Sequence, residues 1–517
     1  MFYGRLGCRS VCRSAAGKTW SYHHDRSLRS GQALSTLCRP QSNAKCRPRF
    51  SSICQTYSTA STVHASDLSF GQPLHETHPH LVQPGELTPG ITAQEYYERR
   101  QRLAQKLPKG AVAIVAAADL VQRTGSCFYE FYQDPDFLYL TGYNEPEALA
   151  IIAPTSDGKD HTFHLYVREK DAKAEIWDGA RSGTQAAVDV FNADETGDIA
   201  SIKTILPRVV SGASQVYTDI TQPDQGPSGL WRFLYGTPRR KTDFVELLDS
   251  RKIKQLHQIM NDLRVFKSPA EIELMRLAGR ASGKAHNEAI RQSFEHEREL
   301  DAYLRYRFIT NGCDQIAYEP VVAGGKNGLG IHYVRNDDVL HDDEMVLIDA
   351  AGKKGGYISD ITRTWPVKGQ FSSEQRDLYE AVLIAQKSLV SMCRADADVS
   401  LDKLHSIAEN LLADSLKQIG FDMSKKAVET LFPHHISHYI GMDVHDTVGY
   451  SRKTSIREGH CITIEPGIYV PDDERWPKHF RNMAIRIEDS VAVGDESPLV
   501  LTSEALKEIK DIEALRN

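Results

Sequence analysis

The sequence predicts an α/β (α+β) fold with two folded domains. The chain has 517 residues, 41% of them hydrophobic and 25% charged, and domains typically take ~100–200 residues each. Strand-like and helix-like segments alternate over residues 89–265, which is typical of an α/β domain. Residues 266–517 begin with a strong helix-start signal and continue with strands that carry carboxylates and histidines. A domain boundary is therefore expected near residue 266.

The first domain is expected to begin with an amphipathic helix over residues 91–107, which starts near Thr92 and stops at residues 108–110. Strands are then predicted at residues 111–117, 137–140, 148–153 and 163–167. Helical patterns cover residues 181–190 and 244–265.

The second domain is expected to open with a long helix. Ser268 is a good N-cap, Pro269 suits the first helical position, and Glu271 lies at the capping-box spacing. Apolar residues further along give this helix a face to bury, namely Ile272, Leu274, Met275, Leu277 and Ala278.

Charge and hydropathy exclude two classes of partner. The net charge is −7 and the pI is near 6.3, which argues against a general nucleic-acid binder. The longest nearly apolar run, residues 110–121, is interrupted by Asp119 and is shorter than the ~20 residues of a spanning helix. We expect no nucleic-acid partner and no integral membrane segment.

The first 66 residues differ from the rest of the chain. They contain ten Lys or Arg residues and one acid, Asp25, a charge of +9, so the other 451 residues carry −16. This segment is rich in Ser and lacks an apolar core, which predicts a mitochondrial transit peptide rather than a secretory signal. The alternative is a basic arm that contacts acidic partners. Processing is expected near residues 49–51 or 55–58, and the mature protein in the mitochondrion, in the matrix or associated with the inner membrane.

Cysteine usage excludes two kinds of site. Five of the nine cysteines lie in the predicted transit peptide. The other four are widely scattered with no CxxC pair, at Cys127, Cys313, Cys393 and Cys461. Neither a disulfide framework nor a zinc-thiolate site is expected.

Residues 345–367 have the composition of a hairpin, with two strand-like runs around a glycine-rich turn. Asp349 and Asp360 are eleven residues apart, so a turn centred on residues 354–355 would place them opposite each other, ~4.5–5.5 Å apart at Cβ. Two like charges there are destabilising, and a divalent metal ion between them is one hypothesis. An exposed polar hairpin is the alternative.

Histidines and glutamates supply further candidate ligands. Residues 434–445 contain four histidines, His434, His435, His438 and His445, and such clustering is typical of a loop or strand that presents imidazoles to a site. Alternation places Thr463 with Glu465, and Arg486 with Glu488, on one face of two predicted strands. The alternative for each strand is a solvated outer face.

Taken together, two Asp, two Glu and at least one His form an oxygen-rich donor set. Such donors favour Mn²⁺, Co²⁺, Fe²⁺ or Zn²⁺ in a two-metal site. Two metal ions ~3.5–4 Å apart activate water and polarise a carbonyl oxygen, which is machinery for hydrolysing an amide.

Four motifs in order, LIDAAGKKGGYISDITRTWPV, HHISHYIGMDVHD, TIEPGIYV and IRIED, resemble the Xaa-Pro aminopeptidase (aminopeptidase P) family of pita-bread metallopeptidases. YEFYQDPDFLYLTGYNEPEALAII is similar to the N-terminal domain of that family, so the resemblance covers roughly residues 89–510. With the basic leader, the chain most resembles the mitochondrial intermediate-cleaving branch. The resemblance implies an N-terminal α/β domain (89–265) followed by a pita-bread catalytic domain (266–517).

The resemblance also assigns roles to residues. It implies five ligands for two divalent ions, with Mn²⁺ preferred: Asp349, Asp360, His438, Glu465 and Glu488. Of these, Asp360 and Glu488 would bridge the ions and Glu465 would also shuttle a proton. Near the substrate it implies catalytic roles for His332 and His445 and site lining by His434. Arg486 lies two residues from Glu488 on the same face of the predicted strand, so we expect it to orient that carboxylate. The alternative for His332 is simple packing beside Tyr333.

The implied function is that of a mitochondrial di-metal aminopeptidase. It would remove a single N-terminal residue from imported proteins after the processing peptidase has acted. Three alternatives stay open: an Xaa-Pro aminopeptidase, a prolidase acting on peptides, and a non-catalytic pita-bread binding module. The implied partners are the N-termini of peptides or imported proteins, and a homodimer is a family-level expectation.

Overall fold

A six-stranded sheet organises the N-terminal part of the structure, a computed structural model that describes residues 68–220, 247–248, 252–423 and 425–516. The predicted transit peptide (1–66) lies outside the described residues. The strand order is β10-β9-β3-β6-β7-β8. Its members are β3 (Val112–Ala116), β6 (Leu149–Pro154), β7 (His161–Val167), β8 (Glu195–Asp198), β9 (Val216–Tyr217) and β10 (Ile253–Lys254). The central pairs β3–β6 and β6–β7 are antiparallel, and the outer pairs are parallel.

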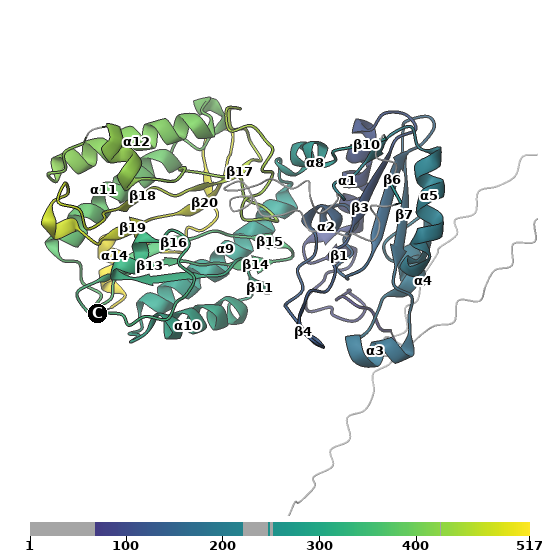
Figure 1. Ribbon diagram of the computed structural model, residues 1–517, viewed down its shortest axis with the longest axis horizontal. Helices are drawn as coiled ribbons and strands as arrows, with labels where there is room; N and C mark the ends of the chain where they lie inside the picture. The colour runs from purple at the N-terminus through teal and green to yellow at the C-terminus, as the bar shows by residue number, and fades with distance from the viewer. Residues whose placement is uncertain (1–67, 221–246, 249–251, 424, 517) are drawn as a thin grey trace, which may run out of the picture. The chain divides into compact units, whose positions relative to one another are not determined.

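Alternation along β3 gives this sheet two apolar faces. Val112 and Ile114 pack with Leu206 of α5 (Ile202–Gly212). Ala113 packs with Leu103 of α1 (Ala93–Lys106), in a different cluster. Successive strand residues point to opposite faces, so the sheet lies between these two helices (Figure 1).

Most of the predicted N-terminal elements are confirmed. The helix α1 begins after Thr92, whose side chain accepts a hydrogen bond from the Glu95 backbone N–H. The strands predicted at 111–117, 148–153 and 163–167 correspond to β3, β6 and β7, and the helix predicted at 181–190 corresponds to α4 (Gly183–Asp189).

The strand predicted at residues 137–140 is wrong, because these residues lie in helix α2 (Pro135–Thr141). Asp134 caps the helix by accepting from the Phe137 N–H, Pro135 occupies the first turn, and Gly142 ends the helix at φ 67°. The apolar run is buried on every side, so its periodicity does not distinguish helix from strand.

The helix predicted at 244–265 is also corrected. Only α8 (His257–Arg264) is helical in its described part, and β10 precedes it as a strand. Residues 244–246 and 249–251 lie outside the described residues. The smaller N-terminal elements are β1 (Glu86–Thr88), β2 (Ile91–Thr92), β4 (Gln122–Thr124), β5 (Cys127–Phe128), α3 (Ala172–Asp178) and the 3-10 turn Ile199–Ser201.

The C-terminal part opens with α9 (Pro269–Ile290), as predicted. Ser268 and Glu271 form the complete capping box. The strands that follow lie between α9 with α10 (Glu297–Thr310) and the pair α11 (Ser373–Val390) with α12 (Leu401–Gln418) (Figure 1). The remaining helices are α13 (Lys425–Leu431) and α14 (Ile509–Ala514), with 3-10 turns at Gly325–Leu329 (η4), Ala395–Ala397 and Lys478–Phe480.

Four small sheets make up the strands of this part. One has the order β12-β13-β16 and another β11-β14-β15, while β17-β20-β21 and β18-β19 form the other two. Their bounds are β11 (Gln315–Ile316), β12 (Val321–Gly324), β13 (Met345–Asp349), β14 (Gly352–Lys354), β15 (Tyr357–Ile358), β16 (Thr362–Pro366), β17 (Cys461–Ile464), β18 (Gly467–Tyr469), β19 (Ala484–Arg486), β20 (Asp489–Ala492) and β21 (Leu499–Val500).

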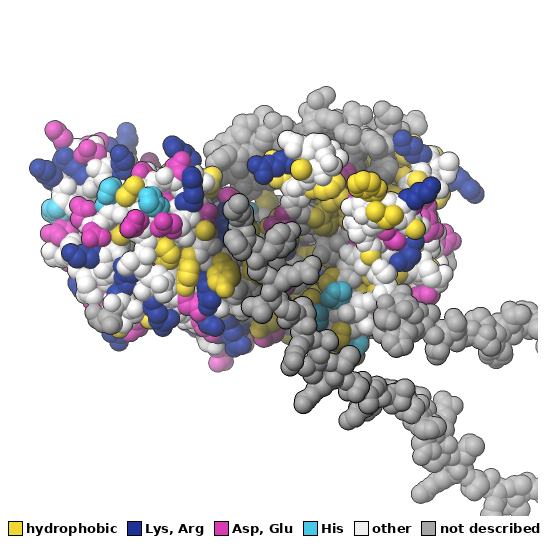
Figure 2. All heavy atoms as spheres, turned by 90° about the horizontal axis from the view of Figure 1, so that it is seen from below, with side chains coloured by type: hydrophobic (Ala, Val, Ile, Leu, Met, Phe, Trp, Pro, Cys, Tyr) yellow, Lys and Arg dark blue, Asp and Glu magenta, His cyan; other side chains and the backbone are white. Residues whose placement is uncertain are grey.

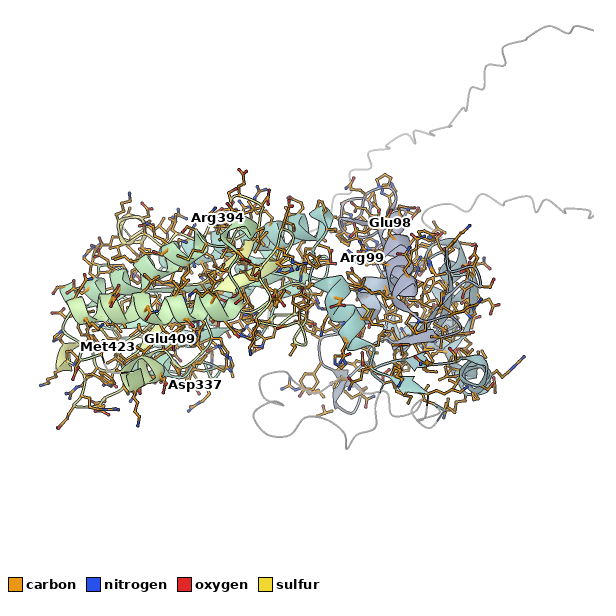
Figure 3. The ribbon with its side chains drawn as sticks, turned by 90° about the horizontal axis from the view of Figure 1, so that it is seen from above. Glu98, Arg99, Asp337, Arg394, Glu409 and Met423 are labelled. Carbon is orange, nitrogen blue, oxygen red and sulfur yellow. The ribbon has the colours of Figure 1, made fainter. Side chains whose placement is uncertain are left out.

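A buried arginine joins α1 to α9. Arg99, labelled in Figure 3, is fully buried and lies between aromatic rings, with its guanidinium carbon 4.3 Å from the Tyr139 ring centroid. Its Nη2 atom is 2.6 Å from Glu95 Oε1 and 3.6 Å from Glu271 Oε1. Glu271 also accepts a hydrogen bond from the Tyr357 hydroxyl in β15 (2.8 Å). One cation thus links the N-terminal helix, the capping box and a strand that leads to Asp360.

Three further features concern hydropathy, surface charge and cysteines. No helix within the described residues is long and apolar enough to cross a membrane. Figure 2 shows Lys and Arg side chains interspersed with Asp and Glu side chains over one face. The four cysteines among the described residues are free, and three of them are buried.

Replacing Arg99 with Met is expected to destabilise the protein by about 3–5 kcal/mol, because removal of one partner leaves the buried Glu271 carboxylate without its cation. The midpoint of urea unfolding measures this loss. Arg102→Met is the matched control, since Arg102 is exposed on the same helix, and it should change stability by no more than about 0.5 kcal/mol. Equal effects of the two variants would contradict the role given to Arg99.

Candidate active site

The hairpin that carries the two aspartates turns one residue later than predicted. Gly355 and Gly356, with φ of 57° and 90°, form the two-residue turn, and positive φ at both central positions is typical of a type I′ hairpin turn. Asp349 therefore pairs with Thr362 instead of Asp360. Residues two apart on a strand share a face, so Asp349 and Asp360 still meet on one side.

Tyr318 joins these two aspartates, and no motif in the sequence predicts this role. Its hydroxyl lies 2.6 Å from Asp349 Oδ1 and 2.5 Å from Asp360 Oδ1. Burial, followed by the charges of the two carboxylates, raises the Tyr318 pKa well above its usual value. The phenol therefore stays neutral and donates one proton between two acceptors.

His438 reaches the same place from an irregular loop that is anchored to β17. Its backbone N–H donates to Thr463 Oγ1 (3.0 Å), and the Thr463 N–H donates to the His438 carbonyl (3.0 Å). The His438 Nδ1 atom lies 3.1 Å from the Tyr439 carbonyl oxygen, which assigns the ring proton to Nδ1. Its Nε2 lone pair then faces Asp360 Oδ2 at 3.5 Å and Glu465 Oε1 at 3.6 Å. This orientation is the one that a metal-binding imidazole requires.

Both glutamates lie where a strand leaves one sheet for another. Glu465 lies between β17 and β18, and Glu488 between β19 and β20. Because β17 pairs with β20 and β18 with β19, each chain segment changes sheet at its glutamate. The two predicted strands are therefore interrupted, and both carboxylates are turned inward instead of lying on a solvated face.

Arg486 binds Asp349 directly and reaches Glu488 through Thr362. Its Nη2 atom donates to Asp349 Oδ2 (2.6 Å) and its Nε atom to Thr362 Oγ1 (3.0 Å). The Thr362 hydroxyl in turn donates to Glu488 Oε2 (2.7 Å). Arg486 also donates to the Tyr469 hydroxyl (2.8 Å). Arg486 thus supports Glu488 through Thr362, a contact that no local motif predicts.

The site holds four carboxylates against one arginine. Burial, more than any neighbouring charge, raises the pKa of Glu465 to about 7 and that of Glu488 well above its usual value. Burial also raises the pKa of Asp349, against the opposing effect of Arg486. For Asp360 burial is the largest single influence and raises the pKa, but contacts with His438, Tyr318 and His445 together outweigh it, so the pKa is lowered.

Several observations fit bound cations. Asp360, His438 and Glu488 offer ligand atoms that all lie within 4.8 Å of one another. The buried Glu488 Oε1 atom has no hydrogen-bond partner among the described residues. Buried charges are normally paired or coordinate metals. The carboxylates of this site outnumber its cationic side chains, and such oxygen donors suit divalent ions.

Two of the predicted histidines, His434 and His438, lie beside Glu465, and a third, His445, packs against His438. The His434 Nδ1 atom is 3.6 Å from Glu465 Oε2, and its Nε2 atom is 2.9 Å from the Tyr469 hydroxyl. Burial lowers the His434 pKa to about 3, so this ring is neutral. The His445 ring centroid is 4.5 Å from that of His438 in an edge-to-face arrangement.

His332 is exposed and lies just beyond η4. Its neighbours Ile331 and Tyr333 are partly buried and pack against a small cluster that includes Tyr469. The residues on either side of His332 are therefore packed, while His332 itself is exposed.

A buried ion cluster fixes the loop that carries His438 and His445. Asp446 is almost fully buried and binds both Lys267 Nζ (2.7 Å) and Arg264. Arg264 also binds Asp443 (3.0 Å) and, from the N-terminal part, Asp136 (2.7 Å). The two basic residues end and follow α8, so this helix holds the histidine loop in place.

Comparison with known proteins agrees with this geometry. Residues 273–495 match the model for metallopeptidase family M24, and residues 96–217 match that for the aminopeptidase P N-terminal domain. The chain is 45% identical over 451 residues to "Intermediate cleaving peptidase 55" of Saccharomyces cerevisiae, covering 86% of this chain and 88% of that protein. The chain belongs to metallopeptidase family M24.

Other M24 relatives extend the similarity to solved structures. The crystal structure of yeast Icp55 lacking its N-terminal 58 residues aligns with a TM-score of 0.76 at 44% identity, over 84% of this chain and 99% of that one. Escherichia coli aminopeptidase P with the inhibitor Pro-Leu aligns with a TM-score of 0.74 at 30% identity, over 82% and 98%. Human "Xaa-Pro aminopeptidase 3" is 36% identical over 464 residues, 86% of this chain and 90% of that protein.

These similarities confirm the predicted family, fold and class of enzyme. This M24 protein is a metalloaminopeptidase that uses divalent metal ions, and its catalytic domain has the pita-bread fold. The hypothesis of a non-catalytic binding module is not supported. Three further site residues are evident only from the structure: Tyr318, Thr362 and Tyr469. Each contacts residues that are distant in the sequence, so no local motif predicts its role.

Removing the Tyr318 hydroxyl with Tyr318→Phe is expected to weaken metal binding by about 10–100-fold, the usual cost of losing a hydrogen bond to metal-binding side chains. Competition with a chromogenic chelator measures the affinity for Mn²⁺ directly. Tyr97→Phe is the matched control, since the Tyr97 hydroxyl also donates to an aspartate, Asp160 (2.8 Å), but on the exposed surface. An unchanged affinity in Tyr318→Phe would show that the phenol does not organise the site.

Proposed function

We propose that this enzyme removes a single N-terminal residue from proteins imported into mitochondria, after the processing peptidase has cut them. The observation that carries the proposal is the buried set of four carboxylates and one histidine with a single arginine to balance them. The charge of +9 on the first 66 residues supports import. So does the name "Intermediate cleaving peptidase 55, mitochondrial" of an Arabidopsis thaliana relative, which is 36% identical over 451 residues. The name of the yeast relative supports the cleavage of an intermediate. The proposed location is the matrix or the inner-membrane surface.

Five side chains are proposed to hold two divalent ions, with Mn²⁺ as the preferred metal: Asp349, Asp360, His438, Glu465 and Glu488. Asp360 and Glu488 are assigned to both ions. When bound, such a pair of ions supplies an activated water and polarises the scissile carbonyl. The residues fit this task, because their donors are oxygen atoms and one oriented imidazole.

Glu465 is the proposed proton carrier. It accepts a proton from the attacking water and returns it to the leaving nitrogen, as general base and then general acid. Its neighbours suit this exchange, since His438 and His434 approach its two oxygen atoms from either side. The Thr463 hydroxyl donates to Glu465 Oε1 (3.2 Å) and fixes the direction of the carboxylate.

The remaining site residues are assigned to orientation of substrate and ligands. His445 donates to the carbonyl oxygen of the substrate as charge develops on it. His332, in the loop after η4, contacts the substrate. His434 lines the pocket, held by the Tyr469 hydroxyl. Arg486 fixes Asp349. Together these residues place one peptide bond, next to a free amine, within reach of the ions.

The second candidate function is that of a conventional Xaa-Pro aminopeptidase, which requires proline as the second residue. The name of the human relative at 36% identity favours it. A prolidase, restricted to dipeptides, is the third. A homodimer stays a prediction for any of these functions.

Two peptides that differ only at the second residue separate the candidates. The chain loaded with Mn²⁺ is offered one peptide beginning Tyr-Ser and another beginning Tyr-Pro, with identical remaining sequence, and the products are read by mass spectrometry. We expect loss of one residue from the Tyr-Ser peptide. Asp360→Ala is the control and should abolish cleavage.

Cleavage of the longer Tyr-Pro peptide, without cleavage of the Tyr-Ser peptide, would instead identify an Xaa-Pro aminopeptidase. If neither peptide is cut but the free dipeptide Tyr-Pro is, the enzyme is a prolidase. Wild-type protein that cuts none of these substrates would contradict the proposal.

A further inference from the structure

A buried carboxylate closes the loop that carries His332. Glu297, the first residue of α10, is fully buried. It accepts four hydrogen bonds, from the Gly324 N–H (2.8 Å), Asn327 Nδ2 (3.0 Å), the Tyr333 hydroxyl (2.8 Å) and the Asp338 N–H (2.9 Å). The first two donors precede His332 in the chain and the last two follow it. One side chain therefore ties both ends of the loop together.

The four donors to Glu297 are all neutral, so hydrogen-bond geometry, and not the attraction of a cation, holds the carboxylate. The structure gives Glu297 no ion pair among the described residues, and its two oxygen atoms each accept two of the four hydrogen bonds. The Glu297 N–H also donates to the Asp338 carbonyl (3.0 Å). A buried carboxylate is costly unless it is fully hydrogen-bonded, so this residue fixes the positions of its donors.

A second buried side chain holds the same loop from its other side. Asn336 is 4% exposed and has a φ of 48°, a conformation that asparagine tolerates better than most residues. Its Oδ1 atom accepts from the Val322 N–H (3.0 Å), and its Nδ2 atom donates to the Pro320 carbonyl (2.9 Å). The loop is thereby attached to β12 as well as to α10.

The loop lies over the strands that form the metal centre. The 3-10 turn η4 sits so close to β19 that a Cβ on Gly328 would lie 2.9 Å from the Ala484 Cβ. Ile331 and Tyr333 pack against a cluster that contains Leu347 of β13 and Tyr469. Tyr469 binds His434 and Arg486, so a shift of this loop displaces His332 relative to the site.

We infer that Glu297 is a positioning residue for His332: it aligns the exposed imidazole with the substrate without touching either substrate or metal. The inference rests on the proposed substrate role of His332. It predicts that loss of the carboxylate lowers the rate of peptide cleavage while the metal ions stay bound.

The test uses Glu297→Gln in the metal-loaded chain. A glutamine amide turns one acceptor oxygen into a donor that faces an N–H group, at Gly324 and Asn327 or at Asp338. We expect kcat/KM on the cleaved peptide to fall ~10–100-fold, the scale on which small misplacements reduce catalysis, with unchanged Mn²⁺ affinity.

The matched control is Glu288→Gln. Glu288 is also a hydrogen-bonded carboxylate, held by Arg307 Nε (2.6 Å) and Asn311 Nδ2 (3.1 Å), but it lies on α9 and has no described contact with the loop. This variant should keep wild-type kcat/KM whatever it does to the melting temperature. If Glu297→Gln does not fold, Tyr333→Phe is used in its place, because it removes one of the four hydrogen-bond donors to Glu297.

A double-mutant cycle with His332→Ala decides whether Glu297 acts through His332. If it does, Glu297→Gln has no further effect in the His332→Ala background, since coupled residues are non-additive. Effects that multiply, or a Glu297→Gln enzyme with wild-type kcat/KM, would overturn the inference. If His332→Ala alone is fully active, the inference is overturned together with the role of His332, while peptide cleavage by wild type still upholds the proposed function. A wild type without activity would refute the proposed function itself.

Discussion

The structure depends on one electrostatic constraint, the confinement of four carboxylates in a buried site that contains a single arginine. Charges of the same sign repel strongly when they lie close together and water is excluded. Burial raises the pKa of Glu465 to about 7 and that of Glu488 well above its usual value, which favours the protonated forms of both side chains. Divalent cations would neutralise the same carboxylates. Because these carboxylates must lose their protons to bind metal, metal affinity depends on the protonation of the site.

Meeting that constraint requires several separate chain segments to converge. The aspartates come from one hairpin, while each glutamate lies where its strand changes sheet. Breaks in regular pairing are common next to active sites, where they redirect a side chain. Here they turn Glu465 and Glu488 inward, whereas unbroken strands would leave them on an outer face.

Described residues of the N-terminal part support the site, although the five proposed ligands all lie after residue 266. Arg99 acts through Glu271 and Tyr357 on the strand before Asp360. Arg264, bound to Asp136 on one side and to Asp446 on the other, acts on the histidine loop. Removing one partner from such buried pairs is strongly destabilising, so the two domains stabilise each other as they build the centre.

Much of this arrangement could be predicted from the sequence, because local patterns encode it. The capping box at Ser268, the alternation around Glu465 and the eleven-residue spacing of Asp349 and Asp360 are all short-range features. The hairpin prediction was wrong by one residue in its turn, yet it placed both aspartates on the correct face because strand side chains repeat every two residues. The family resemblance then assigned the ligands.

Other features could not be predicted, because their cause lies elsewhere in the chain. Residues 137–140 resemble a strand in isolation, and the cap at Asp134 and the stop at Gly142 make them helical. Tyr318 and Glu297 act on groups that are close only after folding, and neither lies in a motif that predicts its partner. The route from Arg486 to Glu488 likewise depends on Thr362, which comes from a different strand.

The most direct test of the central claim is the metal content of the purified chain. Protein equilibrated with Mn²⁺ and freed of excess metal would be analysed by elemental mass spectrometry, with Glu488→Gln as the variant and Asp377→Ala, an exposed aspartate on α11, as the matched control. We expect two ions per chain in wild type and control, and fewer in the variant, because Glu488 is one of the proposed ligands of both ions. A wild-type chain that cleaves peptides with no stoichiometric metal would contradict it.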